Sequence, residues 1–313
     1  MKTTEQLDCM IKEDYKNING MLVVQKDNVI FEKYYNGHGS GDTFHVASVT
    51  KTIISALIGI CVDKGYIKSV DQKVMEFFPE YYCNSSEITV RHLLTMIAPY
   101  PYADWQEPLE ELCTQKDWVE YTLNRIGQGG EIGSFKYSSA GAHLLSAIIT
   151  SVTGKSAREF ANEYLFQPIG MRGIPNYNMK VFGFDDLFGK DVKGWVHDPN
   201  GISTGGWGLT LTVRDMAKFG RLYLNEGTYD GKQILSKSWV KESTEMNPNQ
   251  YGYLWWLREE DGVFSYCAMG DGGNVICCIP EKELVVVIAS EIIPNAGDRW
   301  KLIKDCILPY LKD

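Results

Sequence analysis

The 313-residue sequence predicts an α/β (α+β) fold, in which one antiparallel sheet flanked by helices is built from both chain ends. Two observations carry this prediction. Strand patterns occupy the first part of the chain and return only after about residue 250, while helical patterns and loop signals fill the middle. We therefore expect a discontinuous sheet domain over residues 1–65 and 210–313, and an inserted, mainly helical domain over residues 66–209.

The first predicted element is a β-hairpin. Residues 21–25 and 29–34 are rich in Val, Ile, Phe and Tyr, and the polar residues 26–28 between them suit a tight turn. Helical spacing begins at Ser48, continues to Lys64 and stops at a glycine. Apolar residues nearly encircle this helix, so we expect it to be buried in the middle of the protein.

Helices joined by loops are predicted for the middle of the chain. Residues 117–120 and 156–159 have the spacing of capping boxes that open helices, and residues 140–153 form a further helical pattern. Gly, Pro, Asp and Asn crowd residues 170–208, which indicates long loops, and such loops are often functional. A helix is expected over residues 212–225.

Strand patterns return in the last quarter of the chain, over residues 251–257, 263–269, 274–279 and 284–290. The last of these is apolar throughout, as in a central strand that is covered on both faces. Residues 280–283 form the turn before it, and residues 297–311 suit a closing helix.

Composition and charge exclude several classes of function. The net charge is −9 and no dense Lys/Arg run occurs, so we expect no nucleic-acid partner. The longest apolar run, residues 53–62, is too short to cross a bilayer, so no membrane association is expected. The eight cysteines form no C-x-x-C and the five histidines show no ligand spacing, so we expect neither a metal nor a cofactor.

The beginning of the chain bears on its location. Residues 1–6 contain no apolar segment of the kind that signal peptides carry, so a reduced, cytoplasmic setting is the simpler interpretation. A chain from which a leader had been removed would look the same.

The strongest chemical signal is Ser48-Val49-Thr50-Lys51, an S-x-x-K motif at the start of the buried helix. Residues i and i+3 share a helix face, so the Lys51 amine can reach the Ser48 hydroxyl. The free N–H groups of the helix N-terminus favour a developing oxyanion, and burial disfavours the charged form of a lysine. The pattern therefore predicts a serine nucleophile with a lysine base. The alternative is a helix-capping serine beside a lysine that extends to solvent.

Four segments together resemble the β-lactamase-related serine hydrolases, the family of class C β-lactamases, penicillin-binding proteins and related esterases. They are residues 44–51 around the nucleophile, 88–96, the Gly-rich 205–217 and 251–256. The resemblance covers nearly the whole chain, and it implies the same sheet-plus-helices fold that the periodicity predicts. It also implies hydrolysis through an acyl-enzyme.

The second motif of this family is Tyr-x-Asn, and Tyr137-Ser138-Ser139 occupies its place. The resemblance implies that Tyr137 lies near Ser48 and passes its proton to the leaving group. Ser139 replaces the usual Asn and can still donate one hydrogen bond to substrate. A purely structural tyrosine is the alternative for Tyr137.

The third motif is usually Lys-Thr-Gly or His-x-Gly, and we expect Asp271-Gly272-Gly273 in its place as part of the substrate site. The resemblance assigns the oxyanion-hole N–H groups to Ser48 and Asn274. A carboxylate at Asp271 would repel an anionic substrate group, which argues against penicillinase activity. Alternatively, Asp271 turns away and caps a loop.

Other candidates remain beside these motifs. Trp207 is a candidate to line the substrate cleft, as are Trp255 and Trp256, for which a core position is an equal alternative. Residues 201–205 match G-x-S-x-G, but they lack the preceding strand and following helix of a nucleophile elbow.

These observations predict a serine hydrolase of a small ester, amide or short peptide, esterase-like or D-amino-acid-amidase-like rather than a penicillinase. The alternative is a ligand-binding or sensor protein on the same scaffold, which does not turn over or does so slowly. The sequence leaves the substrate and the oligomeric state open.

Overall fold

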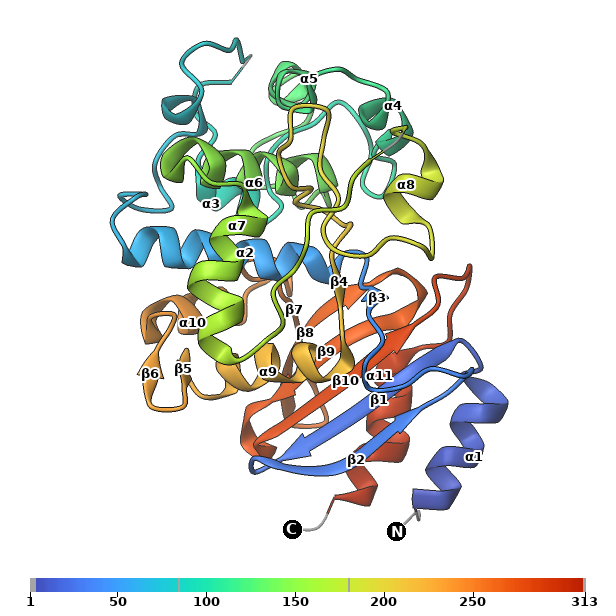
Figure 1. Ribbon diagram of the computed structural model, residues 1–313. Helices are drawn as coiled ribbons and strands as arrows, with labels where there is room; N and C mark the ends of the chain where they lie inside the picture. The colour runs from blue at the N-terminus through green and yellow to red at the C-terminus, as the bar shows by residue number, and fades with distance from the viewer. Residues whose placement is uncertain (1–3, 84, 180, 312–313) are drawn as a thin grey trace.

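The sheet of the computed structural model takes its strands from both chain ends, as predicted. The structure describes residues 4–83, 85–179 and 181–311. The main sheet has six antiparallel strands in the order β2-β1-β10-β9-β8-β7 (Figure 1). Its strands are β1 (Ile18–Gln25), β2 (Asn28–Tyr34), β7 (Trp256–Glu260), β8 (Val263–Gly270), β9 (Asn274–Ile279) and β10 (Leu284–Ser290). Two small pairs complete the strands: β3 (Phe44–His45) with β4 (Thr210–Leu211), and β5 (Thr228–Tyr229) with β6 (Lys232–Gln233).

The hairpin turn and the central strand confirm the sequence predictions. Lys26 and Asp27 both have positive φ, 48° and 62°, as a two-residue turn between antiparallel strands requires. All of β10 is buried, because the sheet is covered on both faces.

The strand predicted over residues 251–257 is wrong in its start, since β7 begins only at Trp256. Leu254 has φ 61° and its N–H donates to the Leu94 carbonyl at 2.9 Å. The preceding residues therefore bend toward the helical layer instead of extending the sheet.

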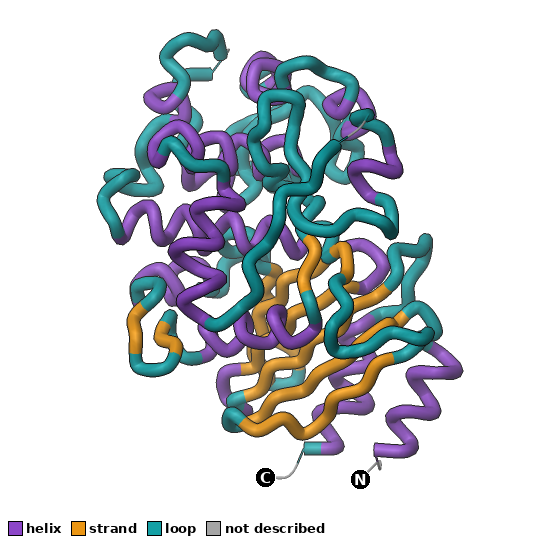
Figure 2. Tube along the Cα trace, viewed as in Figure 1, coloured by secondary structure: helices purple, strands orange, loops and turns teal. Residues whose placement is uncertain are grey.

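Helices cover both faces of the sheet (Figure 2). On one face lie α1 (Thr4–Asp14) and the C-terminal helical segment that starts with α11 (Arg299–Leu302), whose apolar side chains share a cluster with β10. That segment begins as α11 and continues through a π turn (Ile303–Ile307) and a 3₁₀ turn (Leu308–Tyr310), close to the predicted range. Helix α1 was not predicted; only its side with Leu7 and Ile11 is buried. The helices are α1 (Thr4–Asp14), α2 (Val49–Asp63), α3 (Val90–Leu94), α4 (Leu109–Cys113), α5 (Trp118–Arg125), α6 (Ser139–Thr153), α7 (Ala157–Ala161), α8 (Phe184–Phe188), α9 (Val213–Leu224), α10 (Lys237–Ser243) and α11 (Arg299–Leu302).

Helix α2 is the centre of the molecule. Every residue from Val49 to Cys61 is buried, and the helix packs against α6 and α7 on one side and against β8 and β9 on the other. One hydrophobic cluster runs from the sheet through α2 into the helical layer. We propose that residues 66–209 form the helical insertion on this shared core.

The predicted helix starts follow from their caps. Asp117 accepts a hydrogen bond from the N–H of Glu120, and Ser156 and Glu159 form a reciprocal capping box. In the loop-rich segment 170–208, of which residue 180 lies outside the described part, α8 is the helix that the structure shows.

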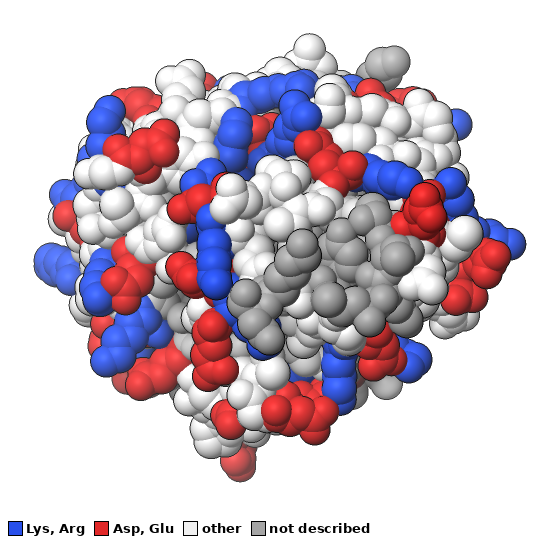
Figure 3. Space-filling view, turned by 90° about the horizontal axis from the view of Figure 1, so that it is seen from below, with Lys and Arg blue, Asp and Glu red and all other residues white. Residues whose placement is uncertain are grey.

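Surface charge is mixed. On the face seen in Figure 3, basic and acidic side chains are interspersed. Within the described residues, no helix is both long and apolar enough to cross a membrane.

Candidate active site

The turn into α2 presents Ser48 to a cleft. Ala47, the residue before it, has φ 48°, a left-handed conformation that turns the chain sharply from β3 into the helix. Two hydrogen bonds hold the turn: the Ala47 N–H donates to His45 Nδ1 at 3.2 Å, and the Thr50 hydroxyl donates to the Ala47 carbonyl at 2.7 Å. A strained residue fixed in this way before a candidate nucleophile is typical of functional sites.

Lys51 lies beside Ser48, as the motif predicts. Its Nζ is 3.0 Å from Ser48 Oγ, 3.0 Å from Ser139 Oγ and 2.8 Å from the Gly206 carbonyl oxygen. The side chain is 1% exposed, and all three partners are uncharged. The alternative of a lysine that extends to solvent is therefore wrong.

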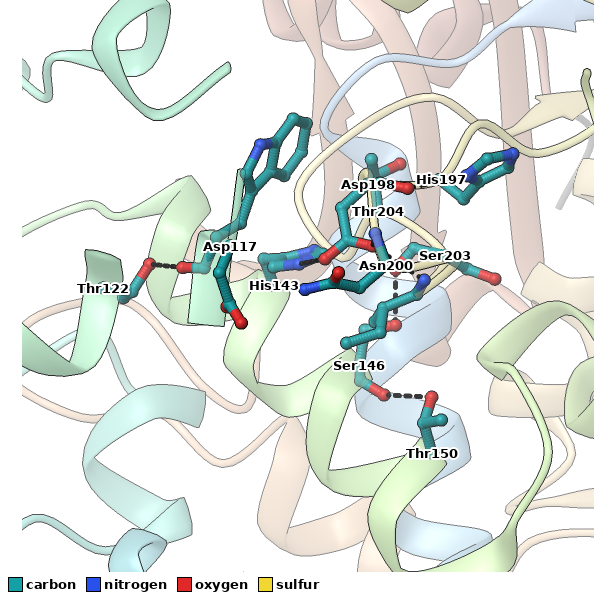
Figure 4. A network of polar contacts seen from close by, with 12 residues as sticks. Asp117, Thr122, His143, Ser146, Thr150, His197, Asp198, Asn200, Ser203 and Thr204 are labelled. Atoms are coloured by element: carbon teal, nitrogen blue, oxygen red, sulfur yellow. Dashed lines mark hydrogen bonds and ion pairs between the residues drawn. The ribbon is translucent and has the colours of Figure 1, made fainter. Parts of the chain in front are cut away.

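A buried polar network joins α6 to the loop that leads to Gly206. His143 on α6 contacts Asp198 at 3.1 Å with both side chains fully buried, and Ser146 Oγ donates to the Ser203 carbonyl at 2.6 Å (Figure 4). A Cβ on Gly205 would lie 2.0 Å from the Ala142 carbonyl oxygen, so only glycine permits this approach. Ser203 of the G-x-S-x-G match is thus buried in a supporting loop.

Ser139 is joined to the site through a carboxylate that the sequence reasoning missed. Glu107 accepts hydrogen bonds from the N–H groups of Ser139 (2.6 Å) and Ala140 (2.8 Å), at the N-terminus of α6. It also accepts from the hydroxyls of Ser138 (2.8 Å) and Tyr102 (3.1 Å). The carboxylate and the helix N-terminus stabilise each other.

Tyr137 faces the cleft as part of an aromatic stack. Lys51 Nζ lies 4.7 Å from the centre of its ring. Trp105 stacks on Tyr137 at 4.8 Å between ring centres, and Trp256 lies 5.8 Å from Tyr137. Trp105 was also missed, because it belongs to a loop without periodicity.

The strand that passes Ser48 is β8, which ends at Gly270. A Cβ on Gly270 would lie 3.1 Å from the Ser48 nitrogen and 2.3 Å from the Val46 carbonyl oxygen. Glycine is therefore required for β8 to approach the nucleophile. Asp271 follows directly, is exposed and lines the cleft, so the alternative that it turns away is not what the structure shows.

The structure does not bring the rest of the expected third motif to Ser48. Gly272 and Gly273 have φ 76° and 81° and turn the chain back, and their carbonyls accept hydrogen bonds from Arg299. Asn274 is fully buried at the start of β9, where its side chain bonds the Asp271 carbonyl and the Ser290 N–H. The expected motif is therefore displaced along the chain, because β8 ends before Asp271.

Of the three tryptophans that are candidates to line the cleft, one does so and two lie in the core. Trp256 lines the cleft. Trp207 is 2% exposed and stacks between Trp118 and Phe188, and Trp255 is fully buried against Phe219 and Tyr223. Trp207 therefore packs in the core of the helical layer instead of binding substrate, since the Gly-rich loop turns it inward.

The cleft has a volume of about 420 Å³ and is lined by Ser48, Trp105, Glu107, Leu109, Tyr137, Ser139, Trp256, Met269, Gly270 and Asp271. Its lining thus includes two serine hydroxyls, a phenol and two carboxylates, and the buried Lys51 amine lies 3.0 Å behind both hydroxyls. Among the described residues, no cluster of three or more His, Cys, Asp or Glu side chains could hold a metal ion.

Solved structures that superpose on this chain define the class of fold. A putative 6-aminohexanoate-dimer hydrolase from Bacillus anthracis superposes with a TM-score of 0.76 at 22% identity, over 97% of this chain and 81% of that one. A class C beta lactamase from Rhodobacter sphaeroides gives 0.67 at 18% identity, over 98% of each chain. The fold is that of the β-lactamases and penicillin-binding proteins.

The family follows from the sequence. The Beta-lactamase family model matches residues 10–302, so this chain belongs to the Beta-lactamase family. A 6-aminohexanoate-dimer hydrolase from Paenarthrobacter ureafaciens is 26% identical over 322 residues, 93% of this chain and 76% of the relative. The putative penicillin-binding protein PbpX from Bacillus subtilis is 23% identical over 286 residues, 89% of this chain and 70% of the relative.

Proposed function

We propose that this protein is a serine hydrolase that acts on an ester or amide through an acyl-enzyme. The observation that carries the proposal is the contact of 3.0 Å between Lys51 Nζ and Ser48 Oγ, at the N-terminus of a buried helix and at the base of a cleft. Membership of the Beta-lactamase family and the hydrolases among its relatives support it.

In the proposed mechanism Ser48 Oγ attacks the acyl carbon while Lys51 and Tyr137 take its proton. The N–H of Ser48 is one oxyanion donor. For the other we propose the N–H of Asp271 in place of Asn274, because Gly270 lies against the Ser48 nitrogen and Asp271 follows it in the cleft. The electron pair on the oxyanion then re-forms the carbonyl, and the bond from the acyl carbon to the leaving group breaks. The leaving group receives the proton that was taken from Ser48. Water then releases the acid by the same route.

We infer that Ser139 serves the mechanism more than the substrate. Its hydroxyl bonds Lys51 and its N–H bonds Glu107, so it fixes the amine where the family usually has Asn. This keeps the site complete despite the substitution.

Charge narrows the proposed substrate. Asp271 is exposed in the cleft and Glu107 lines it, so the cleft disfavours an anionic group. A neutral ester or amide, or an amine-bearing amide or short peptide, fits better than a carboxylate-bearing β-lactam. The relative named 6-aminohexanoate-dimer hydrolase supports an amide.

A panel of short nitrophenyl esters, D-amino-acid amides and a chromogenic cephalosporin, given to wild type and Ser48→Ala, tests the proposal. We expect ester or amide turnover that Ser48→Ala abolishes, and labelling of Ser48 by a fluorophosphonate. Labelling without turnover would favour the sensor alternative, and labelling at Ser203 would refute the assignment.

A further inference from the structure

A second hollow of about 410 Å³ adjoins the cleft on the other side of three shared side chains, Trp105, Trp256 and Met269. Beyond them it is lined mainly by apolar side chains from the sheet edge and the C-terminal helical segment, chiefly Leu257, Cys267, Val275, Trp300 and Ile303. The two hollows therefore lie next to each other, with these three side chains as the wall between them.

The charged residues that line this second hollow already have partners. Arg258 pairs with Glu260 at 3.1 Å and lies over the Trp300 ring. Asp298 caps α11 by accepting from the N–H groups of Trp300 and Lys301. Arg299 is 3% exposed and donates to several carbonyls of the β8–β9 turn and its surroundings. With these charges paired, the hollow presents mainly apolar side chains together with the amides of Asn249 and Gln250, which suits an uncharged aliphatic or aromatic group.

The shared wall is unusually exposed for its composition. Trp105 is 65% exposed and Met269 is 43% exposed, although both are large and apolar. Exposed apolar side chains gathered at the junction of two hollows mark a surface that meets an apolar ligand.

The position of Tyr137 decides which part of the substrate reaches this hollow. Its ring stacks on Trp105 at 4.8 Å and lies 5.8 Å from Trp256, so it sits against the wall that the two hollows share. In the proposed function Tyr137 hands the proton to the leaving oxygen or nitrogen. If Tyr137 delivers the proton, the leaving atom lies within reach of its hydroxyl, and the hollow beyond this wall is the space next to it.

We propose that the second hollow is a subsite for an apolar leaving group, the alcohol or amine half of the ester or amide. This inference rests on the proposed function. When the tetrahedral intermediate collapses, the bond from the acyl carbon to the leaving atom breaks and its electron pair stays on that atom. Tyr137 supplies the proton, and the neutral alcohol or amine remains in the hollow until it dissociates.

The test varies one half of the substrate at a time. With the acid held as acetate and the alcohol extended from methyl to octyl, kcat/KM should rise about fourfold per methylene until the hollow is full. With the nitrophenyl group held and the acyl chain extended, the rise per methylene should be much smaller.

Cys267→Phe fills the hollow from β8, since Cys267 lines it and does not line the catalytic cleft. We expect the octyl-to-methyl ratio of kcat/KM to fall at least tenfold. The matched control is Val263→Phe, which places the same ring on the same strand but outside the hollow. Val263 and Cys267 are four residues apart, so both side chains lie on the same face of β8. The control should keep the wild-type ratio.

A binding measurement separates this inference from the proposed function. In Ser48→Ala, 1-octanol should quench tryptophan fluorescence at saturating concentration, and Cys267→Phe in the same background should abolish the effect. Turnover of methyl acetate with a flat alcohol series and no octanol binding would overturn the subsite and leave the hydrolase standing. Octanol binding without turnover of any ester or amide in the panel would support the hollow and refute the proposed function.

Discussion

Removing the Glu107 carboxylate should loosen the site without touching the nucleophile. In Glu107→Ala the N–H groups of Ser139 and Ala140 lose an ionised acceptor at the start of α6. Ser139 would then hold Lys51 less firmly, because their side chains share a bond of 3.0 Å.

The magnitude follows from the contacts. A hydrogen bond to a charged group contributes about 1.5–3 kcal/mol, and a carboxylate at a helix N-terminus adds about 0.3–1 kcal/mol. Glu107 is half-buried, so water can replace part of the hydrogen bonding that is lost. The low end of the range for a charged hydrogen bond therefore applies to each of the two amide N–H groups. We expect Glu107→Ala to lower the free energy of unfolding by about 3 kcal/mol. Glu107→Gln keeps one oxygen acceptor but places its NH₂ group, a donor, against the other backbone N–H. We therefore expect it to lower the free energy of unfolding by about 1–2 kcal/mol.

Urea unfolding followed by tryptophan fluorescence measures these losses, with Glu110→Ala as the control. Glu110 is exposed on the same segment, so its removal should stay within about 0.5 kcal/mol. A positioning role also predicts that Glu107→Gln lowers kcat more than it changes KM. A Glu107→Ala variant as stable as Glu110→Ala would exclude a stabilising role for Glu107, and a change in KM alone would exclude a positioning role.

Three further predictions concern the site itself. Lys51→Ala and Tyr137→Phe should each slow acylation by about 10²–10⁴-fold. The double variant should lose far less acylation rate than the product of the two single losses, since the two groups act together. Fully multiplicative losses would contradict this. Asp271→His should raise kcat/KM for a carboxylate-bearing β-lactam by roughly one to three powers of ten and change a neutral ester much less; an equal response of both substrates at low and high salt would remove charge selection from Asp271. Burial lowers the pKa of His45 to about 4 from an ordinary 6.5. As the pH falls, His45 is therefore protonated in the unfolded chain before it is protonated in the folded one. The free energy of unfolding should then decrease between about pH 6.5 and pH 4, by up to about 1.4 kcal/mol per pH unit. His45→Gln should flatten that dependence in unfolding curves at pH 7.5, 6 and 5, and an unchanged slope would exclude His45 as its source.

The fold was predictable because its elements have strong local signals. The β-forming residues of β1 and β2 on either side of residues 26–28 predict a hairpin, the apolar run of β10 predicts a central strand, and the apolar residues all round α2 predict a buried helix. Helix α1 escaped because its buried side is small, and β7 was placed early because Leu254 adopts a left-handed turn that its sequence does not announce.

The candidate site was predictable only where its residues lie on regular elements. Ser48 and Lys51 share one face of a helix, so their spacing alone brings them together. Trp105 and Glu107 come from an irregular loop, where no periodicity places a side chain. The third motif was displaced because the end of β8 depends on how closely Gly270 approaches Ser48, which only the packed structure reveals.

The pairing of β1 with β10 has a consequence for synthesis of the chain. Gln25 pairs with Leu284, so during translation β1 has no partner on its β10 side until roughly 260 further residues have been made. At ribosomal rates of about 5–20 residues per second, that wait is on the order of 10–50 s. During this time α2 also lacks β8 and β9, on which it packs. A nascent chain therefore carries its Ser48–Lys51 pair as an unassembled segment until β8 and β9 have been made, and the arrival of these two strands is the event that completes the packing around the site.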